Sequence, residues 1–599
     1  MSRWNVQTQK YVIFLLVLIF WWLIAALLFP VFQDEAYYFS WANHLDFGYF
    51  DHPPLVAFLS KTRDLLSWIQ YSGYPGMEFV AARFAGRMGT MAAAFCSMLL
   101  IVDIVRMLGL KDTESMKTVL VLSGFSFAGL AFGFLVTPDT SLMVCWTAVL
   151  HETIAAVKDE RSISIKGFSI GSVRWLSAGV AAGIGMLAKY TMVLLGPVIL
   201  IAIWRAKRRI FKEPMLYGGF LCAFLVFSPN ILWNARHDWV TMKFQAKHGL
   251  SLDRNKVGIS GDLPSPLLFN KIDDYWRIRS FTQLDPQLDS QKAKRDEREP
   301  TALEKSLERI AGFLGAQLAF WGALLVPVGV VISNFLRRKK REDRDSISKM
   351  SWIGTSCGEL IHDDFVRALL QGGVWVPILF FGLISIFSKV EANWAVMYLI
   401  SAAILLTPYL KSRRKLLGVC ASINVVIFLG ILAHVSCGGL INVGSKDRLL
   451  KETHGYKGLT QTIAQTIENK INEISAKGPP VIFTENYQLA SMIKYYNPSL
   501  KAVQWPRVSR PSELTRNAIY QDVPYKEIQE EATFWMVVEN PYPPSFEGWA
   551  IIDMMQIRDC ARMKVEPLTL QEVEKEVVPD CRNPIHKWFL VRYKLLTAT

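Results

Sequence analysis

Four ionisable side chains lie close together in the sequence, just after a long apolar segment at residues 11–29: Asp34, Glu35, Asp51 and His52. Two prolines follow His52 directly and restrict the backbone there. Ionisable groups at the edge of a membrane are costly to place and are usually functional. A carboxylate at such an edge can act as a general base, a metal ligand, or both. The alternative is a capped helix end followed by a solvated loop.

Apolar helices must position these groups. The chain has 599 residues, 51% of them hydrophobic, and a spanning helix needs about 20 mostly apolar residues. Eleven segments are candidate spans: residues 11–29, 79–107, 117–136, 140–157, 175–187, 190–204, 215–233, 310–335, 374–387, 394–410 and 416–435. The two segments around Lys189 are short, and form either one long helix or two half-depth helices. The pattern predicts a polytopic membrane protein of the all-α class.

The basic residues predict how these spans are oriented. The net charge is +14, but the clusters at 205–209, 337–341 and 411–415 flank apolar segments, which favours a membrane protein over a nucleic-acid-binding one. Basic loops are typically cytoplasmic. The loops 34–78 and 234–300, the turns at 136–139 and 389–393, and the tail after Cys437 are then all outside. The spans cross the membrane in an alternating order that agrees with these positions only if Lys189 lies at an outer or mid-membrane turn.

The first apolar segment is interpreted as a retained span, because it is too long for the core of a signal peptide and acidic residues follow it. We expect a multi-pass protein of the inner (plasma) membrane. Cys560 and Cys581 lie in the tail, where an oxidising compartment would let them pair.

A second domain is predicted at the C-terminal end. Residues 480–484, 534–538 and 588–592 have the pattern of strands, and residues 459–474 that of a helix. We expect a transmembrane domain at 1–437, with outer loops 30–78 and 234–309, and a small α/β domain at 438–599. The tail carries no nucleotide-binding fingerprint. The polar segment 250–300 and the charged segment 337–370 are not assigned a role.

Further charged residues fall on the predicted outer face. Asp139 is a third carboxylate there, although capping of a helix is the stronger explanation for it. Arg83 and Arg87, one helical turn apart, either snorkel to lipid headgroups or grip a phosphate. An intramembrane lysine such as Lys189 is a functional candidate by default, and snorkelling is the alternative, more so for Lys389.

A metal site is a further hypothesis. His237 and His248 lie in one boundary loop, and a carboxylate with imidazoles suits a divalent transition ion. Asp51 with His237 or His248 is the expected ligand set. Phosphate binding by a protonated His52 would explain the same loop without a metal.

Several of these segments together resemble a known family. They are Asp34-Glu35-Ala-Tyr-Tyr, Gly48-Tyr-Phe-Asp51-His52-Pro53-Pro54, Thr137-Pro138-Asp139, Gly185-Met-Leu-Ala-Lys189-Tyr190, Trp233-Asn234-Ala-Arg-His237-Asp238-Trp239 and Asn393-Trp394. In this order, over most of residues 1–410, they resemble the bacterial GT-C transferases that use polyprenyl-phosphate sugars. That superfamily includes the protein O-mannosyltransferases and the transferases that add aminoarabinose or galacturonic acid to lipid A.

The resemblance implies a glycosyltransferase that takes a sugar from undecaprenyl phosphate on the outer face of the inner membrane. The acceptor would be lipid A, another envelope glycan or glycolipid, or a protein. Asp34, Glu35 and Asp139 are the expected catalytic carboxylates, with Asp34 as general base. The cations expected at the donor phosphate are His52, Arg83, Arg87, Lys189 and Lys389.

Two other classes of function compete with this one. A secondary transporter or lipid flippase would also have many spans and intramembrane charges, but such proteins often contain internal repeats, and none is evident here. A scaffold whose tail is the active part would leave the acids of the first loop unexplained. The identities of the sugar and of the acceptor stay open.

Overall fold

The computed structural model describes residues 6–65, 77–158, 163–165, 168–250, 301–334, 363–441, 443–471, 481–504, 512–516, 533–539, 543, 549–559, 566–569 and 584–595. Its contacts divide the chain into two compact units. The helical unit comprises Met1–Leu28, Leu45–Leu252 and Leu303–Gly430. The sheet unit comprises Phe29–His44, Asp253–Ala302 and Ile431–Thr599. The predicted boundary between residues 437 and 438 stays a prediction.

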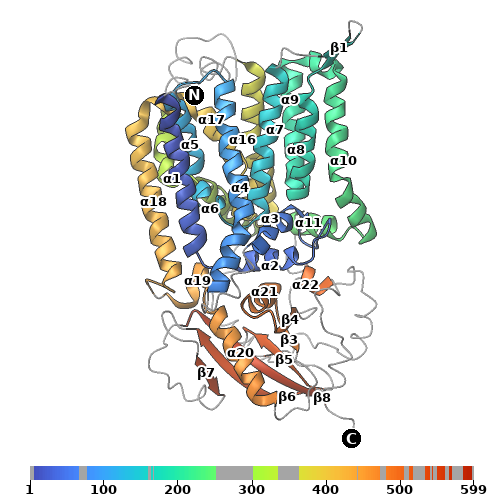
Figure 1. The fold of residues 1–599 in the computed structure, drawn as a ribbon, viewed down its shortest axis with the longest axis vertical. Helices are drawn as coiled ribbons and strands as arrows, with labels where there is room; N and C mark the ends of the chain where they lie inside the picture. Colours follow the sequence, from blue (N-terminus) through green and yellow to red (C-terminus); the bar gives the residue numbers. More distant parts are fainter. Residues whose placement is uncertain are drawn as a thin grey trace. The chain divides into compact units, whose positions relative to one another are not determined.

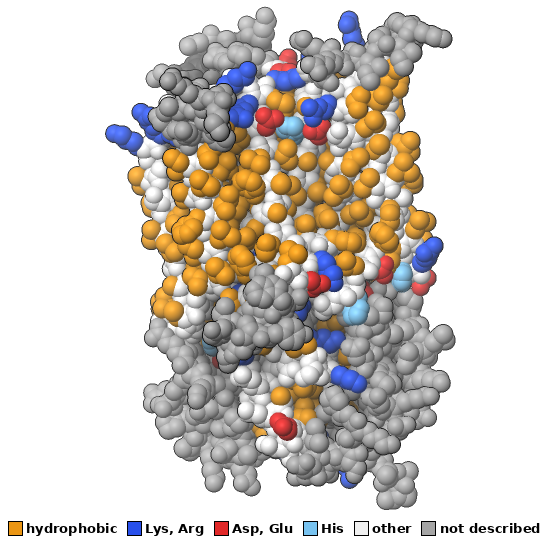
Figure 2. Space-filling view, in the orientation of Figure 1, with side chains coloured by type: hydrophobic (Ala, Val, Ile, Leu, Met, Phe, Trp, Pro, Cys, Tyr) orange, Lys and Arg blue, Asp and Glu red, His pale blue; other side chains and the backbone are white. Residues whose placement is uncertain are grey.

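The helical unit is a bundle of apolar helices (Figure 1). Its main helices are α1 (Val6–Leu28), α3 (Leu55–Ser60), α4 (Met77–Met107), α5 (Thr113–Gly124), α6 (Phe127–Phe132), α7 (Pro138–Lys158), α8 (Arg174–Ala188), α9 (Leu195–Ala206), α10 (Pro214–Arg236), α11 (Val240–Leu250), α14 (Ala302–Ala319), α16 (Asp364–Phe387), α17 (Tyr398–Leu410) and α18 (Arg414–Ser436). Short β1 (Ile163–Ile165) and β2 (Phe168–Gly171) form a hairpin before α8. Figure 2 shows a broad band of hydrophobic side chains over this unit, with charged side chains beyond it.

Six helical segments among the described residues are long and apolar enough to cross a membrane, and the pair Ala302–Ala319 and Gly322–Asn334, bent by 95°, is either a seventh, broken span or a re-entrant loop. The protein is therefore a multi-pass membrane protein. The predicted count of eleven stays a prediction. That count treats α17 and α18 as two spans, whereas in the structure they form one continuous candidate segment, Tyr398–Ser436. It also counted the short helices on either side of Lys189.

Glycine allows α8 and α10 to pack closely. A Cβ atom added to Gly179 on α8 would lie 2.0 Å from the carbonyl oxygen of Gly219 on α10. Helix α8 also packs on α7. It ends at Ala188, where Lys189 adopts an extended conformation (φ −161°, ψ 135°) before the 3-10 turn η2 (Tyr190–Leu194). The chain therefore breaks its helix at the buried lysine.

The sheet unit contains a six-stranded sheet with the order β4-β3-β5-β8-β6-β7. The strands are β3 (Val481–Thr484), β4 (Lys501–Gln504), β5 (Thr533–Val538), β6 (Trp549–Asp559), β7 (Glu566–Thr569) and β8 (His586–Leu595). Strand β3 is parallel to β4 and β5, whereas β8 is antiparallel to β5 and β6, and β7 to β6. Its helices include α19 (Arg448–Thr453), α20 (Tyr456–Ile471), α21 (Tyr487–Tyr496) and α22 (Glu513–Arg516). The three strands expected from the sequence overlap β3, β5 and β8.

One helix of the sheet unit comes from the opposite end of the sequence. Helix α2 (Gln33–Ala42) packs on α21, and Figure 1 shows the two side by side. The ring centroids of Tyr37 and Tyr487 are 4.4 Å apart, and those of Phe39 and Tyr495 are 6.1 Å apart. The sequence did not predict this grouping. The acidic pair of the first loop is thus part of the sheet unit.

Candidate active site

A buried ion pair joins three segments of the helical unit. The ammonium of Lys189 lies 2.7 Å from Oδ1 of Asp139, and the two side chains are 8% and 2% exposed. The side-chain amide of Asn393 donates to the other carboxylate oxygen of Asp139 at 2.6 Å. A buried charge is tolerated when it is paired and its remaining hydrogen-bonding positions are filled. The structure therefore brings Asp139 and Lys189 together and adds Asn393, which the sequence did not assign to the site.

Local structure explains how these three side chains meet. Asp139 is in the first turn of α7, and the Thr137 hydroxyl accepts a hydrogen bond from the Thr140 N–H at 3.2 Å, capping that helix. Lys189 occupies the extended residue between α8 and η2. Asn393 belongs to the 3-10 turn η7 (Ala392–Ala395), which follows α16. Asp139 and Lys189 thus lie at the ends of helices, and Asn393 lies in the short turn between α16 and α17.

The loop that carries Asp51 is fixed by side chains of α10 and α11. The indole N–H of Trp233 donates to Asp46 Oδ2 at 2.7 Å, and the amide of Asn230 donates to the Phe47 carbonyl at 2.7 Å. The Thr241 hydroxyl donates to the Tyr49 carbonyl at 2.6 Å. Such a dense set of hydrogen bonds to a loop backbone holds the loop in one conformation.

Two further features show how closely this loop is fitted. A Cβ atom at Gly48 would lie 2.3 Å from the ring of Trp233, so only glycine fits there. At the end of α10, Asp238 and Trp239 both have positive φ, 54° and 58°. Residues held in this region cost about 1–3 kcal/mol each and cluster at functional sites. The strained pair lies inside the motif Trp233–Trp239 that carried the family resemblance.

The predicted metal ligands do not form a complete site among the described residues. Asp51 is buried, and Gln245 on α11 contacts both its carbonyl and Nδ1 of His52, the latter at 3.3 Å. Nδ1 of His237 bonds to the Trp233 carbonyl at 2.7 Å. In the part of the chain that is described, no three His, Cys, Asp or Glu side chains are grouped as metal ligands. The side chain of His248 lies outside the described residues, so the metal stays a hypothesis.

The predicted phosphate-binding arginines hold the end of α1. Arg87 is 0% exposed, donates to the Ala26 carbonyl at 2.9 Å and lies over the ring of Phe134. Arg83 donates to the Leu27 carbonyl. The last carbonyls of a helix lack partners within the helix and carry partial negative charge. Two cations at that end therefore have a structural reason to be there, independent of any phosphate.

Lys389 differs from the other predicted cations because it is at the surface. Its ammonium lies 3.6 Å from Glu391, and the two side chains are 55% and 37% exposed. An exposed pair of this kind contributes little to stability. Lys389 therefore stays accessible to a ligand, whereas Lys189 is enclosed.

Asp34 and Glu35 have different environments on α2. Glu35 is 1% exposed, and its carboxylate accepts a hydrogen bond from the Phe32 N–H at 3.1 Å, closing the start of the helix. Asp34 is exposed and accepts a hydrogen bond from the Tyr487 hydroxyl at 3.3 Å. Glu35 therefore caps the start of α2, and Asp34 is the more exposed of the two carboxylates.

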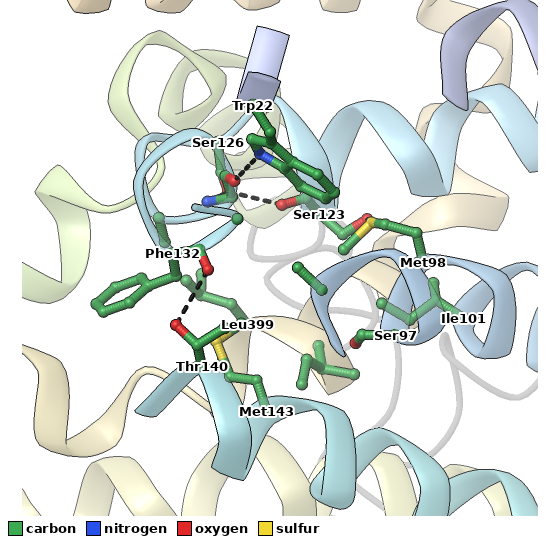
Figure 3. Close-up of a pocket in the computed structure, with 15 residues that line it drawn as sticks. Trp22, Ser97, Met98, Ile101, Ser123, Ser126, Phe132, Thr140, Met143 and Leu399 are labelled. Atoms are coloured by element: carbon green, nitrogen blue, oxygen red, sulfur yellow. Dashed lines mark hydrogen bonds between the residues drawn. The ribbon is translucent and has the colours of Figure 1, made fainter. Parts of the chain in front are cut away.

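A small cavity lies beneath Trp22 in the helical unit (Figure 3). It has a volume of about 30 Å³ and is lined by side chains that include Ser97, Ser126 and Thr140. The Thr140 hydroxyl donates to the Phe132 carbonyl at 3.0 Å, and the Trp22 indole to the Gly129 carbonyl at 3.0 Å. A space of this size has room for water but not for a sugar.

Comparison with known proteins shows what this arrangement is similar to. The family described as dolichyl-phosphate-mannose-protein mannosyltransferase matches residues 68–233. The apo crystal structure of ArnT from Cupriavidus metallidurans superimposes with a TM-score of 0.54 at 11% identity, over 98% of each chain. The protein has a GT-C fold. The superfamily predicted from the sequence motifs is confirmed at this level.

A curated relative supports the same GT-C assignment. RgtD, a lipid A galacturonosyltransferase from Rhizobium johnstonii, is 23% identical over 253 residues, which are 40% of this chain. The match spans about half of the relative, 47% of its length.

Some residues of the arrangement were missed from the sequence. Asp46 gave no signal, because a lone acid in a loop resembles any solvated residue. Asn393 lay in a recognised motif, but its partner Asp139 is 254 positions away. Tyr487 lies 453 positions from Asp34 and in the other part of the predicted domain scheme. Their roles depend on tertiary contacts that spacing does not encode.

Proposed function

We propose that the protein is a membrane glycosyltransferase that moves a sugar from a polyprenyl-phosphate donor to a hydroxyl group of an envelope glycolipid. The observation that carries this proposal is the exposed carboxylate of Asp34, oriented by Tyr487 on a helix whose other acid is buried. The GT-C fold supports it, as does the match to a family named for a lipid-phosphate sugar donor. The name of the relative from Rhizobium johnstonii favours lipid A as the acceptor.

The reaction needs one base and one stabilised leaving group. The acceptor oxygen attacks the anomeric carbon of the donor sugar, and its proton passes to the Asp34 carboxylate. The bond from that carbon to the phosphate oxygen breaks, and its electron pair leaves with the polyprenyl phosphate. General-base help contributes about 10²–10⁴-fold, and stabilisation of the developing phosphate charge usually lowers the barrier more than any other single effect.

The proposal divides the predicted cations into two groups. Lys189 and Arg87 are buried, the first paired with the Asp139 carboxylate and the second hydrogen-bonded to the Ala26 carbonyl. His52, Arg83 and Lys389 are more exposed and are assigned to the donor phosphate. A divalent metal at Asp51 would add charge at the same place, but no step of the proposed reaction depends on it.

The proposal also includes eleven membrane spans. It assigns both the reaction and the C-terminal α/β region to the periplasmic face of the inner membrane. The basic clusters at 205–209 and 411–415 support this orientation, since cytoplasmic loops carry an excess of Lys and Arg.

Transfer by the purified protein tests the function. Full-length protein in lipid nanodiscs is given polyprenyl-phosphate galacturonic acid and lipid A, and the products are analysed by mass spectrometry. We expect lipid A to gain the mass of one sugar residue, and envelope from cells lacking the protein to lack that modification. Movement of the lipid-linked sugar across proteoliposomes without any transfer would support the flippase alternative instead.

A further inference from the structure

The sheet unit has a topological switch point at the edge where β3 and β5 end. Strand β3 lies between β4 and β5 and is parallel to both, so the chain passes from β3 first to one side and then to the other. In open α/β sheets, ligands bind outside the carboxyl ends of the strands at such a point. The residues that follow the two strands directly are Glu485 and Glu539.

These two glutamates are held together. The backbone N–H of Glu539 donates to Oε1 of Glu485 at 3.1 Å, and both side chains are half-buried. Burial, with the neighbouring Glu539 carboxylate, raises the pKa of Glu485 to about 7. Burial also raises the pKa of Glu539. A carboxyl group that is protonated part of the time both donates and accepts hydrogen bonds, as a sugar hydroxyl does.

The antiparallel strands bring two more polar side chains to the same edge. Asp559 ends β6 and pairs in register with His586, which begins β8. They are 0% and 3% exposed, and Oδ1 of Asp559 and Nε2 of His586 have no hydrogen-bond partner among the described residues. A buried polar atom left unbonded costs about 1–3 kcal/mol. The other carboxylate oxygen of Asp559, Oδ2, is paired with Nδ1 of His454 at 3.1 Å.

Helix α2 places the proposed base beside this edge. Tyr487, which binds Asp34, is two residues beyond Glu485. The side-chain amide of Gln33 pairs with the hydroxyl of Tyr456, whose ring centroid lies 5.2 Å from that of His586. Two tyrosines therefore link α2 to the residues at the strand ends.

We propose that this edge of the sheet unit binds the saccharide headgroup of the acceptor, with Glu485 and Glu539 hydrogen-bonded to its hydroxyl groups beside Asp34. The identification of the ligand as the acceptor rests on the proposed function. Two half-buried carboxyl groups repel a phosphate, which argues against the donor. Carboxyl groups hydrogen-bond well to hydroxyls, whether they are ionised or protonated.

Kinetics of isosteric variants provide the first test. Glu485→Gln and Glu539→Gln are compared with wild type and with Glu468→Gln, a control at an exposed position of α20. We expect the KM for the acceptor, measured at pH 8, to rise about tenfold or more in the first two variants, because an amide makes a weaker hydrogen bond to a sugar hydroxyl than an ionised carboxylate does. The KM for the donor should stay within about twofold. An unchanged acceptor KM in both variants would overturn the proposal.

Direct binding provides a test that does not require turnover. The probe is the glucosamine disaccharide of lipid A without its phosphates and acyl chains, detected by saturation-transfer NMR on the full-length protein in nanodiscs. Wild type and Glu468→Gln should bind it, and the Glu485→Gln/Glu539→Gln double variant should not. Absence of binding to folded wild type overturns this site. Normal probe binding with no sugar transfer supports the site and overturns the proposed function instead.

Discussion

At the scale of single residues, the carboxyl group of Asp34 decides whether the proposed chemistry holds. We expect Asp34→Asn to keep the fold and donor binding but to lose most turnover, because the amide cannot accept a proton. The amide oxygen of Asn still accepts the hydrogen bond from the Tyr487 hydroxyl, so a purely structural role would tolerate the change. Sugar transfer by purified wild type and variant is the measurement. Near-normal turnover in Asp34→Asn would exclude it as the base and leave Glu35 or Asp139 to be tested.

The pair of Lys189 and Asp139 makes a prediction about stability. Removing one partner leaves the other charge buried and uncompensated, which typically costs about 3–5 kcal/mol. Lys189→Met should therefore lower the thermal unfolding temperature in detergent sharply. The double variant Lys189→Met/Asp139→Asn should recover much of the loss, since neither charge remains. Equal destabilisation by the single and double variants would contradict a role for the pair as a mutual neutraliser.

Glu485 makes a prediction about pH. Its pKa is raised from the ordinary 4.5 to about 7, so between these values the folded state binds more protons than the unfolded state. The free energy of unfolding that depends on Glu485 therefore falls as the pH rises through this window. Glu485→Gln should be more stable relative to wild type at pH 8 than at pH 5, measured by thermal unfolding. His586, whose pKa burial lowers to about 3, has the opposite effect as the pH falls below 6.5 and is unchanged in the comparison.

At the scale of elements, Arg87 links α4 to the end of α1. Arg87→Met removes the hydrogen bond to the Ala26 carbonyl and leaves that carbonyl buried, which costs about 1–3 kcal/mol. We expect a lower unfolding temperature with the KM for the donor unchanged. Arg87→Lys keeps the charge but not the planar fork and should recover part of the stability. A large rise in the KM for the donor without loss of stability would contradict this role and indicate that Arg87 binds the donor phosphate.

The helices and strands also show what could be predicted from the sequence. The break at Lys189 was one of two alternatives that the sequence left open, because two short apolar runs flank a charge there. The pairing of that charge with Asp139 was not predictable, since it depends on how α7 and α8 pack. The strands β3, β5 and β8 were predictable from their apolar pattern. The packing of α2 on α21 was not predictable. Aromatic residues near a membrane edge are equally suited to contact lipid headgroups, and this contact joins distant parts of the chain.

At the scale of the whole molecule, the basic clusters predict the orientation in the membrane. Cysteines substituted at Arg209, Lys340 and Arg414 should be protected from a membrane-impermeant reagent added outside, whereas cysteines at 250–300 and after residue 440 should react. Lys340 and most of 250–300 lie outside the described residues, so labelling supplies information that the structure does not. Reaction of the residue at 340 from outside would place the acidic loops in the wrong compartment for a lipid-linked donor.

The packing of α2 on α21 has a consequence for the synthesis of the protein. Asp34 leaves the ribosome early, but Tyr487 follows it by 453 residues. At about 5–20 residues per second, synthesis needs between about 20 and 90 s to supply that partner. Throughout this interval a nascent chain can have its first helices in the membrane while the carboxylate of Asp34 still lacks its hydrogen-bond partner. If Asp34 is the base, chains released early by a premature stop would therefore insert but remain inactive, and the proposed transfer activity would require translation to be nearly complete.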